Sequence, residues 1–386
     1  MKNILCLNKI AKVGTDKLDP AVYNVGTEVE APDAIMVRSA AMHDMVFDKN
    51  TVAIARAGAG VNNIPVERCA SEGIVVFNTP GANANGVKEL AICALMLASR
   101  DVFGGIEWAQ SLAGTADVAK QVEKGKSQFA GVEIGGKTLG VIGLGAIGGL
   151  VANAAVALGM NVIGCDPFLS VDAAWNIDSN VKKAATFEDV FKVADYVTLH
   201  VPATKDTKGM ICEKSLALMK DGVRIINLAR ADLVCAADIK AAIESGKVAS
   251  YVTDFPTEEV LGVKGIVTIP HLGASTEESE DNCAVMAALE LDDYLRYGNI
   301  KNSVNFPNLT MPMSDDARIC VLHANVPGII SQITTAVGEA GINIENMMNK
   351  SKGDNAYTVL DVAGDVSADV NAKLCAITGV YRVRVI

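Results

Sequence analysis

An arginine, two adjacent glutamates and a histidine stand in the second half of the chain, where a fold could bring them to one substrate. Arg230 and His271 each follow a short apolar run, and Glu258 and Glu259 lie in the segment between them. A histidine with an ordinary pKa of about 6.5 can exchange a proton with a hydroxyl group. A guanidinium can bind a carboxylate through two hydrogen bonds, and a glutamate beside an imidazole favours its charged form. These residue types therefore predict proton transfer at the hydroxyl of a small carboxylic acid.

A glycine-rich motif earlier in the chain predicts the hydride acceptor. Residues 143–148 read Gly-Leu-Gly-Ala-Ile-Gly, between a strand-like segment at 138–142 and an alanine-rich helical segment. In this context the glycines allow a tight turn and bring the backbone close to a pyrophosphate at the start of the helix. A carboxylate at the end of the next strand can bind both ribose hydroxyls and would repel a 2′-phosphate, which favours NAD over NADP. The predicted cofactor residues here are Gly143, Gly145, Ala146, Ile147, Gly148 and Asp166.

The elements that must position these residues follow from alternating apolar and polar segments. Strand-like runs separated by helix-like segments indicate βαβ units in two parallel sheets, and such sheets place ligands at the carboxyl ends of their strands. The predicted strands are 4–7, 34–37, 52–55, 74–77, 139–142, 162–165, 196–200, 224–228, 250–253 and 266–269, with helices at 87–98 and 277–297.

The C-terminal part of the chain has a different pattern. Residues 302–314 are rich in Asn and Pro and are predicted to form a linker. Beyond it, a strand-helix-strand-strand-helix-strand order predicts a ferredoxin-like module. Its predicted elements are 318–323, 328–340, 342–345, 357–362, 367–377 and 380–385.

Composition argues against several functional classes. The 386-residue chain has 34 Lys and Arg against 45 Asp and Glu, and this net charge of −11 argues against binding to nucleic acid or an anionic membrane. Its longest wholly apolar run, residues 90–98, is too short to cross a bilayer, and the first residues lack a signal-peptide pattern. Nine cysteines without a CxxC pair predict reduced packing thiols in a cytoplasmic protein, and the lack of a Cys/His cluster predicts no metal site.

Taken together, many segments of the chain resemble the D-2-hydroxyacid dehydrogenases. The matching segments are residues 37–40, 56–63, 78–80, 143–148, 199–202, 227–230, 254–258, 270–276 and 303–307. The resemblance implies an α/β fold with two doubly wound, Rossmann-like lobes: a substrate lobe at 1–95 that residues 283–305 complete, and an NAD-binding lobe at 96–282. Residues 316–386 resemble an ACT domain, a small amino-acid-sensing module with a ferredoxin-like fold.

Within this family, the chain is similar to the members that oxidise D-3-phosphoglycerate to 3-phosphooxypyruvate with NAD, the first step of L-serine biosynthesis. The resemblance implies that His271 takes the proton of the 2-hydroxyl, that Glu258 orients His271, and that Arg230 holds the carboxylate and polarises the C2 oxygen. It also implies cofactor contacts from His200, Pro202, Thr207, Ala229, Asp254 and Gly273, and substrate contacts from Arg38, Ser39, Gly58, Ala59, Gly60 and Lys88.

Three departures from the family pattern leave alternatives open. Matching on residues 255–257 makes Glu258 the partner of His271, whereas counting from Asp254 makes it Glu259. Asp232, close after the predicted catalytic arginine, could repel an anionic substrate. Lys88, where the family usually has a small residue, is either a substitute anion ligand or a solvated helix residue.

Two other functions compete with this one. The same chemistry could act on another 2-hydroxy acid, such as 2-hydroxyglutarate, glycerate or, in the reverse direction, hydroxypyruvate. A non-catalytic NAD(H)-sensing, corepressor-like protein could share the fold, but the presence of Arg230, Glu258 and His271 together favours an enzyme.

The resemblance to an ACT domain also implies regulation. In serine-regulated members the effector binds at an interface between two such domains, and the matching residues here are His323, Asn325 and Asn343. Alternatively, the module only dimerises the chain. Because dehydrogenases of this fold pair through the nucleotide lobe, we expect a homo-oligomer, either a dimer or a tetramer.

Overall fold

The chain forms two compact units in the computed structural model, which describes residues 1–313 and 317–386. Unit 1 contains Met1–Asn83 and Glu277–Ile386, and unit 2 contains Ala84–Thr276. The domain boundaries expected from the sequence, at 95/96 and 282/283, remain predictions. Residue 314, where the predicted linker ends, and residue 316, where the predicted ACT domain begins, lie outside the described residues.

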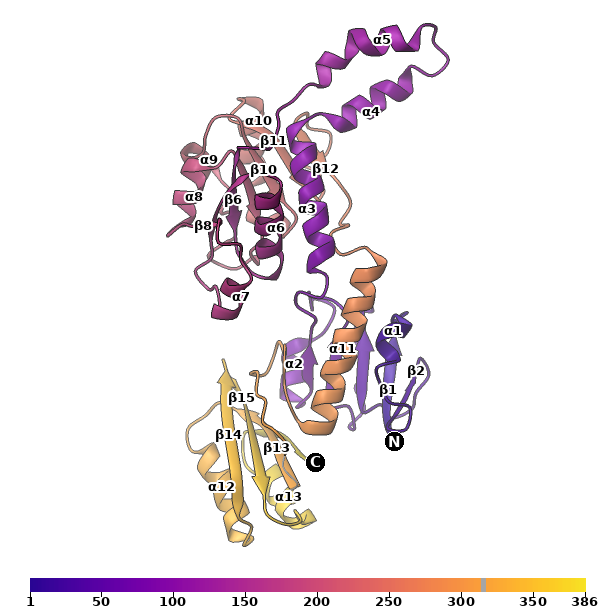
Figure 1. Ribbon diagram of the computed structural model, residues 1–386. Coiled ribbons are helices and arrows are strands. Elements are labelled where there is room, and N and C mark those ends of the chain that lie inside the picture. Colours follow the sequence, from indigo (N-terminus) through magenta and orange to yellow (C-terminus); the bar gives the residue numbers. More distant parts are fainter. Residues whose placement is uncertain (314–316) are drawn as a thin grey trace. The chain divides into compact units, whose positions relative to one another are not determined.

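Unit 1 contains a parallel five-stranded sheet with the order β2-β1-β3-β4-β5 (Figure 1). A buried face of α11 covers it, with Cys283, Ala287 and Leu291 at the four-residue spacing of a helix. Tyr294 of the same helix packs against Phe77 of β5, with ring centroids 5.6 Å apart. The elements are β1 (Lys2–Leu7), β2 (Tyr23–Gly26), β3 (Ala34–Val37), β4 (Ala53–Arg56), β5 (Val75–Phe77), α1 (Lys12–Thr15), α2 (Val66–Ser71) and α11 (Glu277–Tyr297).

The C-terminal part of unit 1 is an antiparallel four-stranded sheet with the order β14-β15-β13-β16, and α12 and α13 pack on one face of it (Figure 1). The strand and helix order confirms the predicted ferredoxin-like fold. The elements are β13 (Ala317–Ala324), α12 (Ile329–Glu339), β14 (Ile344–Lys352), β15 (Asn355–Val362), α13 (Ala368–Cys375) and β16 (Val380–Val385).

One predicted strand of this sheet, 342–345, is wrong in its extent. The observed strand β14 begins at Ile344 and continues to Lys352. Most of its side chains are polar and exposed, because β14 is an edge strand held by backbone hydrogen bonds to β15. Such a strand carries no apolar alternation in its sequence, which explains the error.

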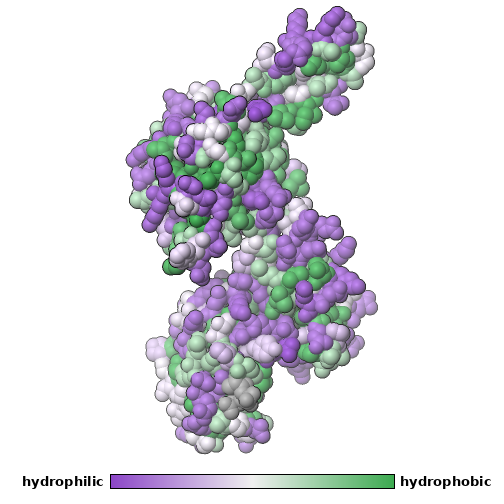
Figure 2. All heavy atoms as spheres, in the orientation of Figure 1, coloured by the Kyte–Doolittle hydropathy of each residue, from purple (hydrophilic) through white to green (hydrophobic). Residues whose placement is uncertain are grey.

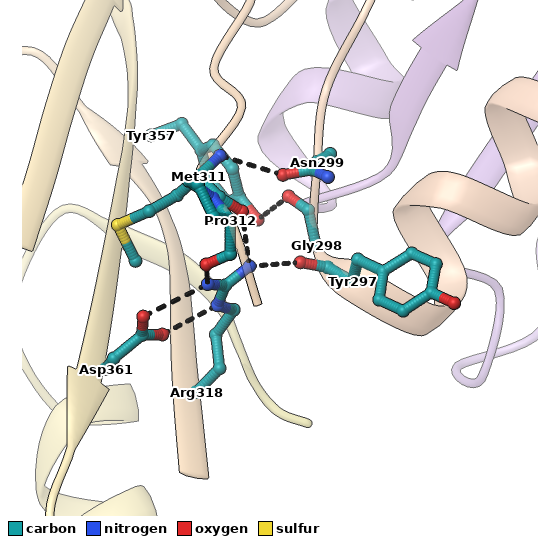
Figure 3. Close-up of polar contacts among 8 residues, drawn as sticks. All are labelled: Tyr297, Gly298, Asn299, Met311, Pro312, Arg318, Tyr357 and Asp361. Atoms are coloured by element: carbon teal, nitrogen blue, oxygen red, sulfur yellow. Dashed lines mark hydrogen bonds and ion pairs between the residues drawn. The ribbon is translucent and has the colours of Figure 1, made fainter. Parts of the chain in front are cut away.

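A buried ion pair joins the C-terminal sheet to the segment that leads into it (Figure 3). Arg318 of β13 donates to both carboxylate oxygens of Asp361, at 2.7 and 3.1 Å, and neither side chain is exposed. The guanidinium also donates to the carbonyl groups of Tyr297, Met311 and Pro312, at 2.8, 3.0 and 2.5 Å. All five donors of the arginine are therefore used, as a buried charge requires.

Unit 2 is built around a parallel seven-stranded sheet with the order β12-β11-β10-β9-β6-β7-β8. Alternate residues of its strands enter two core clusters, one with α3 and α6 and the other with α8, α9 and α10. The strands are β6 (Thr138–Ile142), β7 (Asn161–Cys165), β8 (Lys182–Lys183), β9 (Tyr196–Leu199), β10 (Val223–Asn227), β11 (Val248–Thr253) and β12 (Ile266–Thr268). The helices are α3 (Ala84–Ser99), α4 (Val102–Ser111), α5 (Val118–Gly125), α6 (Ala146–Ala157), α7 (Val171–Trp175), α8 (Phe187–Val193), α9 (Glu213–Leu218) and α10 (Ala236–Glu244), with short 3₁₀ turns at Lys126–Phe129 and Ala231–Leu233.

This sheet confirms the predicted α/β fold with doubly wound parallel sheets. The strand order reverses between β6 and β9, and in such sheets ligands bind at the carboxyl ends of the strands flanking that point. All the strands predicted for unit 2 are present. The two-residue β8, Lys182–Lys183, carries no apolar pattern and was not predicted.

The described residues also bear on membrane, metal and thiol predictions. Within residues 1–313 and 317–386, no helix is long and apolar enough to cross a membrane. The same residues contain no group of three or more His, Cys, Asp or Glu side chains that could hold a metal ion. All nine cysteines are free, but Cys93 and Cys375 are exposed rather than packed in a core.

Candidate active site

The glycine turn lies at the carboxyl end of β6, where the strand order of unit 2 reverses. Gly143 has a φ of 88°, and a Cβ there would lie 2.6 Å from the carbonyl oxygen of His200. A Cβ on Gly148 would lie 1.9 Å from the carbonyl oxygen of Gly143, whereas a Cβ on Gly145 would meet open space. The first and third glycines therefore allow the turn and helix to pack closely, and the second leaves the backbone open to a ligand.

A helix start and a carboxylate flank this turn. Ala146 and Ile147 begin α6, so their backbone N–H groups have no acceptor within the helix. Asp166 follows β7, and its two oxygens accept hydrogen bonds from the backbone N–H groups of Leu144 and Phe168, each at 2.9 Å. Each oxygen keeps a second lone pair that can accept a hydroxyl. These groups therefore fit the pyrophosphate and the ribose hydroxyls of NAD.

His200 and the loop after β9 lie beside the glycine turn. Nε2 of His200 lies 2.9 Å from Oγ1 of Thr198, and burial lowers the pKa of His200 to about 4. The imidazole is therefore neutral at pH 7. Thr207 donates from Oγ1 to the carbonyl oxygen of Pro202 at 2.6 Å, which closes the loop on itself. The contact of these residues with a cofactor remains a prediction.

Arg230 stands just beyond the carboxyl end of β10. The buried Asn227 amide holds the backbone here, because Nδ2 donates to the Arg230 carbonyl at 2.9 Å and Oδ1 accepts from the Ala229 N–H at 3.2 Å. The guanidinium is exposed and donates from Nη1 to the Ala229 carbonyl at 2.6 Å. Nζ of Lys208 lies 3.3 Å from the Asp232 carboxylate. The ammonium group of Lys208 therefore offsets the negative charge of Asp232 near Arg230.

His271 follows β12 and lies against residues that follow β11. Its ring centroid is 4.8 Å from that of Phe255, and the two planes are inclined at 50°. Asp254 is fully buried, and burial raises the pKa of its carboxyl group, while the charges of His271 and Arg230 act in the opposite direction. A Cβ on Gly273 would lie 3.5 Å from Oδ2 of Asp254. The structure therefore gathers these groups at one edge of the sheet.

The two candidate glutamates lie in the exposed loop between β11 and β12. Glu258 and Glu259 are both exposed. Among the described residues, neither forms a hydrogen bond or an ion pair with His271. The side chain in contact with the imidazole is Phe255. The assignment of Glu258, or of Glu259 as its alternative, remains a prediction.

The predicted substrate residues of unit 1 follow β3 and β4. Arg38 donates from Nη2 to Oε1 of Glu280, on α11, at 2.5 Å, and both side chains are about two-fifths exposed. The backbone N–H of Ser39 donates to Oδ1 of Asn8 at 3.1 Å. Arg38 is joined to β4 because its carbonyl accepts from Nε of Arg56 at 3.1 Å.

The glycine loop after β4 is held by two residues that follow β5. The Asn78 side chain donates to the carbonyl oxygen of Ala59 at 2.5 Å. The backbone N–H of Thr79 donates to the carbonyl oxygen of Gly58 at 3.2 Å. Gly58 has a φ of 154°, and a Cβ there would lie 2.6 Å from Nη1 of Arg56. The first residue of the loop, Gly58, therefore has a conformation that favours glycine.

Lys88 belongs to unit 2, in the first turns of α3. Its ammonium group donates to Oδ1 of Asn85 at 2.6 Å and lies 3.9 Å from the Glu89 carboxylate. These contacts with its own helix agree with a solvated helix residue, and they leave ammonium donors for an anion. Both interpretations of Lys88 remain open.

The predicted effector residues do not lie together in one chain. His323 is buried, with Nε2 2.8 Å from Thr358 Oγ1 and Nδ1 2.7 Å from the Ala324 carbonyl, and burial lowers its pKa. Exposed Asn325 is close to it in sequence and donates to the Gly353 carbonyl at 3.0 Å. His323 pairs with Ala356 across the sheet, whereas Asn343 bonds to Ala363. At about 3.3 Å per residue, Asn343 therefore lies about 20 Å away, at the opposite end of the strands.

Comparison with known proteins identifies the family. Residues 106–273 match the model of the D-isomer specific 2-hydroxyacid dehydrogenase, NAD binding domain. D-3-phosphoglycerate dehydrogenase 1 of Saccharomyces cerevisiae is 30% identical over 346 residues, which are 83% of this chain and 70% of the yeast protein. The chain belongs to the D-isomer-specific 2-hydroxyacid dehydrogenases. This membership accounts for the doubly wound sheets, and the matched domain confirms the predicted NAD type of cofactor site.

Other D-isomer-specific 2-hydroxyacid dehydrogenases match over much of the chain. D-3-phosphoglycerate dehydrogenase of Archaeoglobus fulgidus is 36% identical over 295 residues, which are 73% of this chain. The chain spans only 53% of the length of that relative. The crystal structure of NAD+-bound 3-phosphoglycerate dehydrogenase from Entamoeba histolytica is 27% identical, with a TM-score of 0.62, and covers 80% of this chain and 99% of its own.

Several residues with contacts at the candidate site were not predicted from the sequence, among them the following three. Phe255 packs on His271, Glu280 bonds Arg38, and Lys208 pairs with Asp232. Each acts through a partner that is distant in the sequence. The signal in the sequence was a departure from the family pattern, which usually has a Val between the residues matching Asp254 and Phe255; that Val is absent here.

Proposed function

We propose that this protein oxidises D-3-phosphoglycerate to 3-phosphooxypyruvate with NAD, as the first step of L-serine biosynthesis. The observation that carries the reaction type is the gathering of Asp254, His271 and Arg230 at one edge of a sheet that bears an NAD-type glycine turn. The substrate is inferred from the relatives, several of which are named D-3-phosphoglycerate dehydrogenase.

In the proposed reaction, Arg230 binds the carboxylate of the substrate and polarises its C2 oxygen. The O–H bond of the 2-hydroxyl breaks as its proton moves to a ring nitrogen of His271, and the C2–H bond breaks as its hydride leaves. When bound, NAD accepts that hydride. Glu258, or Glu259 as the alternative, orients the imidazole.

The substrate phosphate is proposed to bind in unit 1. Arg38 supplies a guanidinium and Ser39 a hydroxyl to the phosphate, whereas the backbone N–H groups of residues 58–60 are proposed to bind the substrate carboxylate. Because Glu280 now accepts a hydrogen bond from Arg38, the phosphate competes with that carboxylate for the guanidinium. This competition favours a dianionic group over a neutral one.

A substrate panel tests this proposal. NAD reduction is followed at 340 nm with D-3-phosphoglycerate, D-2-hydroxyglutarate and D-glycerate, and NADH oxidation is followed with hydroxypyruvate. We expect the highest kcat/KM with D-3-phosphoglycerate. A higher value with another acid would reassign the substrate, and no turnover with NADH binding intact would favour the sensor function.

Assembly and regulation are further parts of the proposal. Exposed apolar side chains gather on α4, where Phe103 and Ile106 are 58% and 55% exposed (Figure 2). We propose that two copies pair through this face, in a cytoplasmic homo-oligomer, because an apolar patch of this kind is typical of a protein interface. L-serine is the proposed effector at the C-terminal module, with His323, Asn325 and Asn343 as ligands. Calorimetry with L-serine tests this point, since the absence of binding at millimolar concentration contradicts it.

A further inference from the structure

A hollow in unit 1 is lined by none of the residues proposed above to bind the substrate, the cofactor or the effector. It has a volume of about 490 Å³ and is walled by three segments: the residue after β5, the chain after α11, and the end of β14. Asn78, Asn302 and Asn308 come from the first two segments. Lys350, Ser351 and Lys352 come from the last.

The hollow carries charge of one sign only. Among the described residues that line it, two are lysines and none is Asp or Glu. This is notable in a chain with a net charge of −11. One lining residue, Asn302, contacts a carboxyl group, because its side chain donates to buried Glu290 at 2.7 Å. Burial raises the pKa of Glu290 to about 8, so this group is mostly neutral at pH 7 and does not offset the lysines.

The two lysines stand on the same face of β14. Residues two apart in a strand lie about 7 Å from each other, and like charges in that position repel. Their partners across the ladder, Tyr357 and Asn355, bring no opposite charge. Lys352 is also tethered, because Nζ donates to the Ser303 carbonyl at 2.8 Å, and burial lowers its pKa. Each of these facts raises the electrostatic energy of the ammonium groups at the hollow, and an anion bound between them would lower it.

We propose that this hollow binds a small polyvalent oxyanion, with one carboxylate or phosphate group between the ammonium groups of Lys350 and Lys352. Two hydrogens of the Lys352 ammonium group remain after its bond to Ser303, and the Asn308 side chain adds a neutral donor. A monovalent ion is too weakly attracted to compete with water at this exposed edge, so the ligand class is a phosphate ester or a di- or tricarboxylate.

The hollow shares one wall with the glycine loop of the proposed substrate site. The backbone N–H of Asn78 donates to the Asn302 carbonyl at 3.3 Å, and the Asn78 side chain donates to Ala59. An anion in the hollow therefore acts on the same residue that holds residues 58–60. This link to catalysis rests on the proposed function, whereas binding of the anion does not.

Calorimetric titration of the full chain at low ionic strength tests the site, with citrate and inorganic phosphate as separate probes. The test variant is the double substitution Lys350→Gln with Lys352→Gln. The matched control is Lys373→Gln, an exposed lysine of α13 outside the hollow. The Arg230→Gln variant removes the proposed carboxylate ligand of unit 2 and separates binding there from binding in the hollow.

We expect the wild type, Lys373→Gln and Arg230→Gln to bind at least one of the two probes, and the double variant to bind it about tenfold more weakly. Preference for citrate or for phosphate then distinguishes the two ligand classes. Equal affinity in the double variant and the control, or no binding by the wild type at millimolar probe, overturns the inference. Unchanged circular dichroism of the double variant excludes misfolding, and no outcome depends on turnover.

Discussion

The rings of Phe255 and His271 lie with their centroids 4.8 Å apart, at an inclination of 50°. Phe255 is half-buried at the end of β11, and its backbone N–H donates to Oγ1 of Thr253 at 3.2 Å, so its position is set by the strand. Tilted aromatic contacts at such distances stabilise one orientation of the partner ring. The orientation of the proposed proton acceptor therefore depends on an aromatic contact.

Replacement of Phe255 by leucine should lower kcat while leaving the KM for NAD unchanged. The leucine keeps apolar volume but removes the ring, and a misplaced catalytic group costs about tenfold to a hundredfold in rate. Phe255→Tyr should retain activity, and Phe168→Leu, at a phenylalanine that is 93% exposed, is the matched control. Because the chain has only four histidines, NMR can follow the His271 ring directly. An unchanged His271 signal in Phe255→Leu contradicts the positioning role.

Replacement of the proposed proton acceptor or of the proposed carboxylate ligand should strongly reduce turnover without unfolding the protein. His271→Gln removes the proton acceptor and should lower kcat by about 10²–10⁴. Arg230→Lys should also lose activity, because one ammonium group cannot replace a bidentate guanidinium. Steady-state kinetics and NADH binding are the measurements, and binding should survive both substitutions. Normal kcat in either variant would reject its assigned role.

Breaking the buried Arg318–Asp361 pair should destabilise unit 1. Arg318→Ala leaves the Asp361 carboxylate buried without its partner, which costs about 3–5 kcal/mol of unfolding free energy. Lys301→Ala breaks an ion pair of 2.8 Å whose lysine is 58% exposed, and such pairs contribute about 0–1 kcal/mol. Thermal and urea unfolding should therefore show a clearly larger loss of unfolding free energy for Arg318→Ala than for Lys301→Ala. Similar losses in both would show that burial of the pair does not matter.

Stability should fall as pH rises toward 8 because of Glu290. Burial raises the pKa of this carboxyl group from 4.5 to about 8 in the folded chain. Between these values the folded state holds a proton that the unfolded state has released, so the stabilisation is full below pH 4.5 and is lost as pH rises through 8. Glu290→Gln should remove this part of the pH dependence. Melting temperatures of the wild type and of Glu290→Gln at pH 5, 7 and 9 measure this pH dependence. Parallel curves of melting temperature against pH would contradict the raised pKa of Glu290.

A charge on the apolar face of α4 should block assembly. Phe103→Glu combined with Ile106→Glu should yield monomers, because two buried charges cannot be compensated in a pair of such faces. Phe168→Glu, another exposed apolar position of unit 2, is the control and should leave the assembly intact. Light scattering after size-exclusion chromatography gives the mass of each. An unchanged mass in the double variant would place the interface elsewhere.

Local patterns predicted most of the fold. The glycine turn at 143–148 and the buried strands were readable because apolar alternation, turn glycines and helix spacing are properties of neighbouring residues. The edge strand β14 was not, because its side chains are exposed and only its backbone pairing defines it. The linker before the C-terminal sheet also has no apolar pattern. The hydrogen bonds from Arg318 to the carbonyl groups of Met311 and Pro312 could therefore not be predicted.

The candidate site was less predictable than the fold. Arg230 and His271 follow predicted strands, so their places at one sheet edge could be inferred. Arg38 pairs with Glu280, and Asp232 pairs with Lys208. The residues of each pair are far apart in the sequence, so their spacing could not predict these contacts. The contact of Phe255 with His271 depends on how two adjacent strands end, which a pattern of residue types does not specify.

The separation of Asn343 from His323 and Asn325 implies that sensitivity to the effector depends on the concentration of the protein. A single effector site that uses all three residues must take Asn343 from a second copy of the chain, since the two ends of β14 are too far apart to share one small molecule. Such a site exists only in the associated protein. By mass action, sensitivity to the effector would then decline as the protein is diluted below the dissociation constant of the assembly, while the chemistry at Arg230 and His271 within unit 2 need not decline in step.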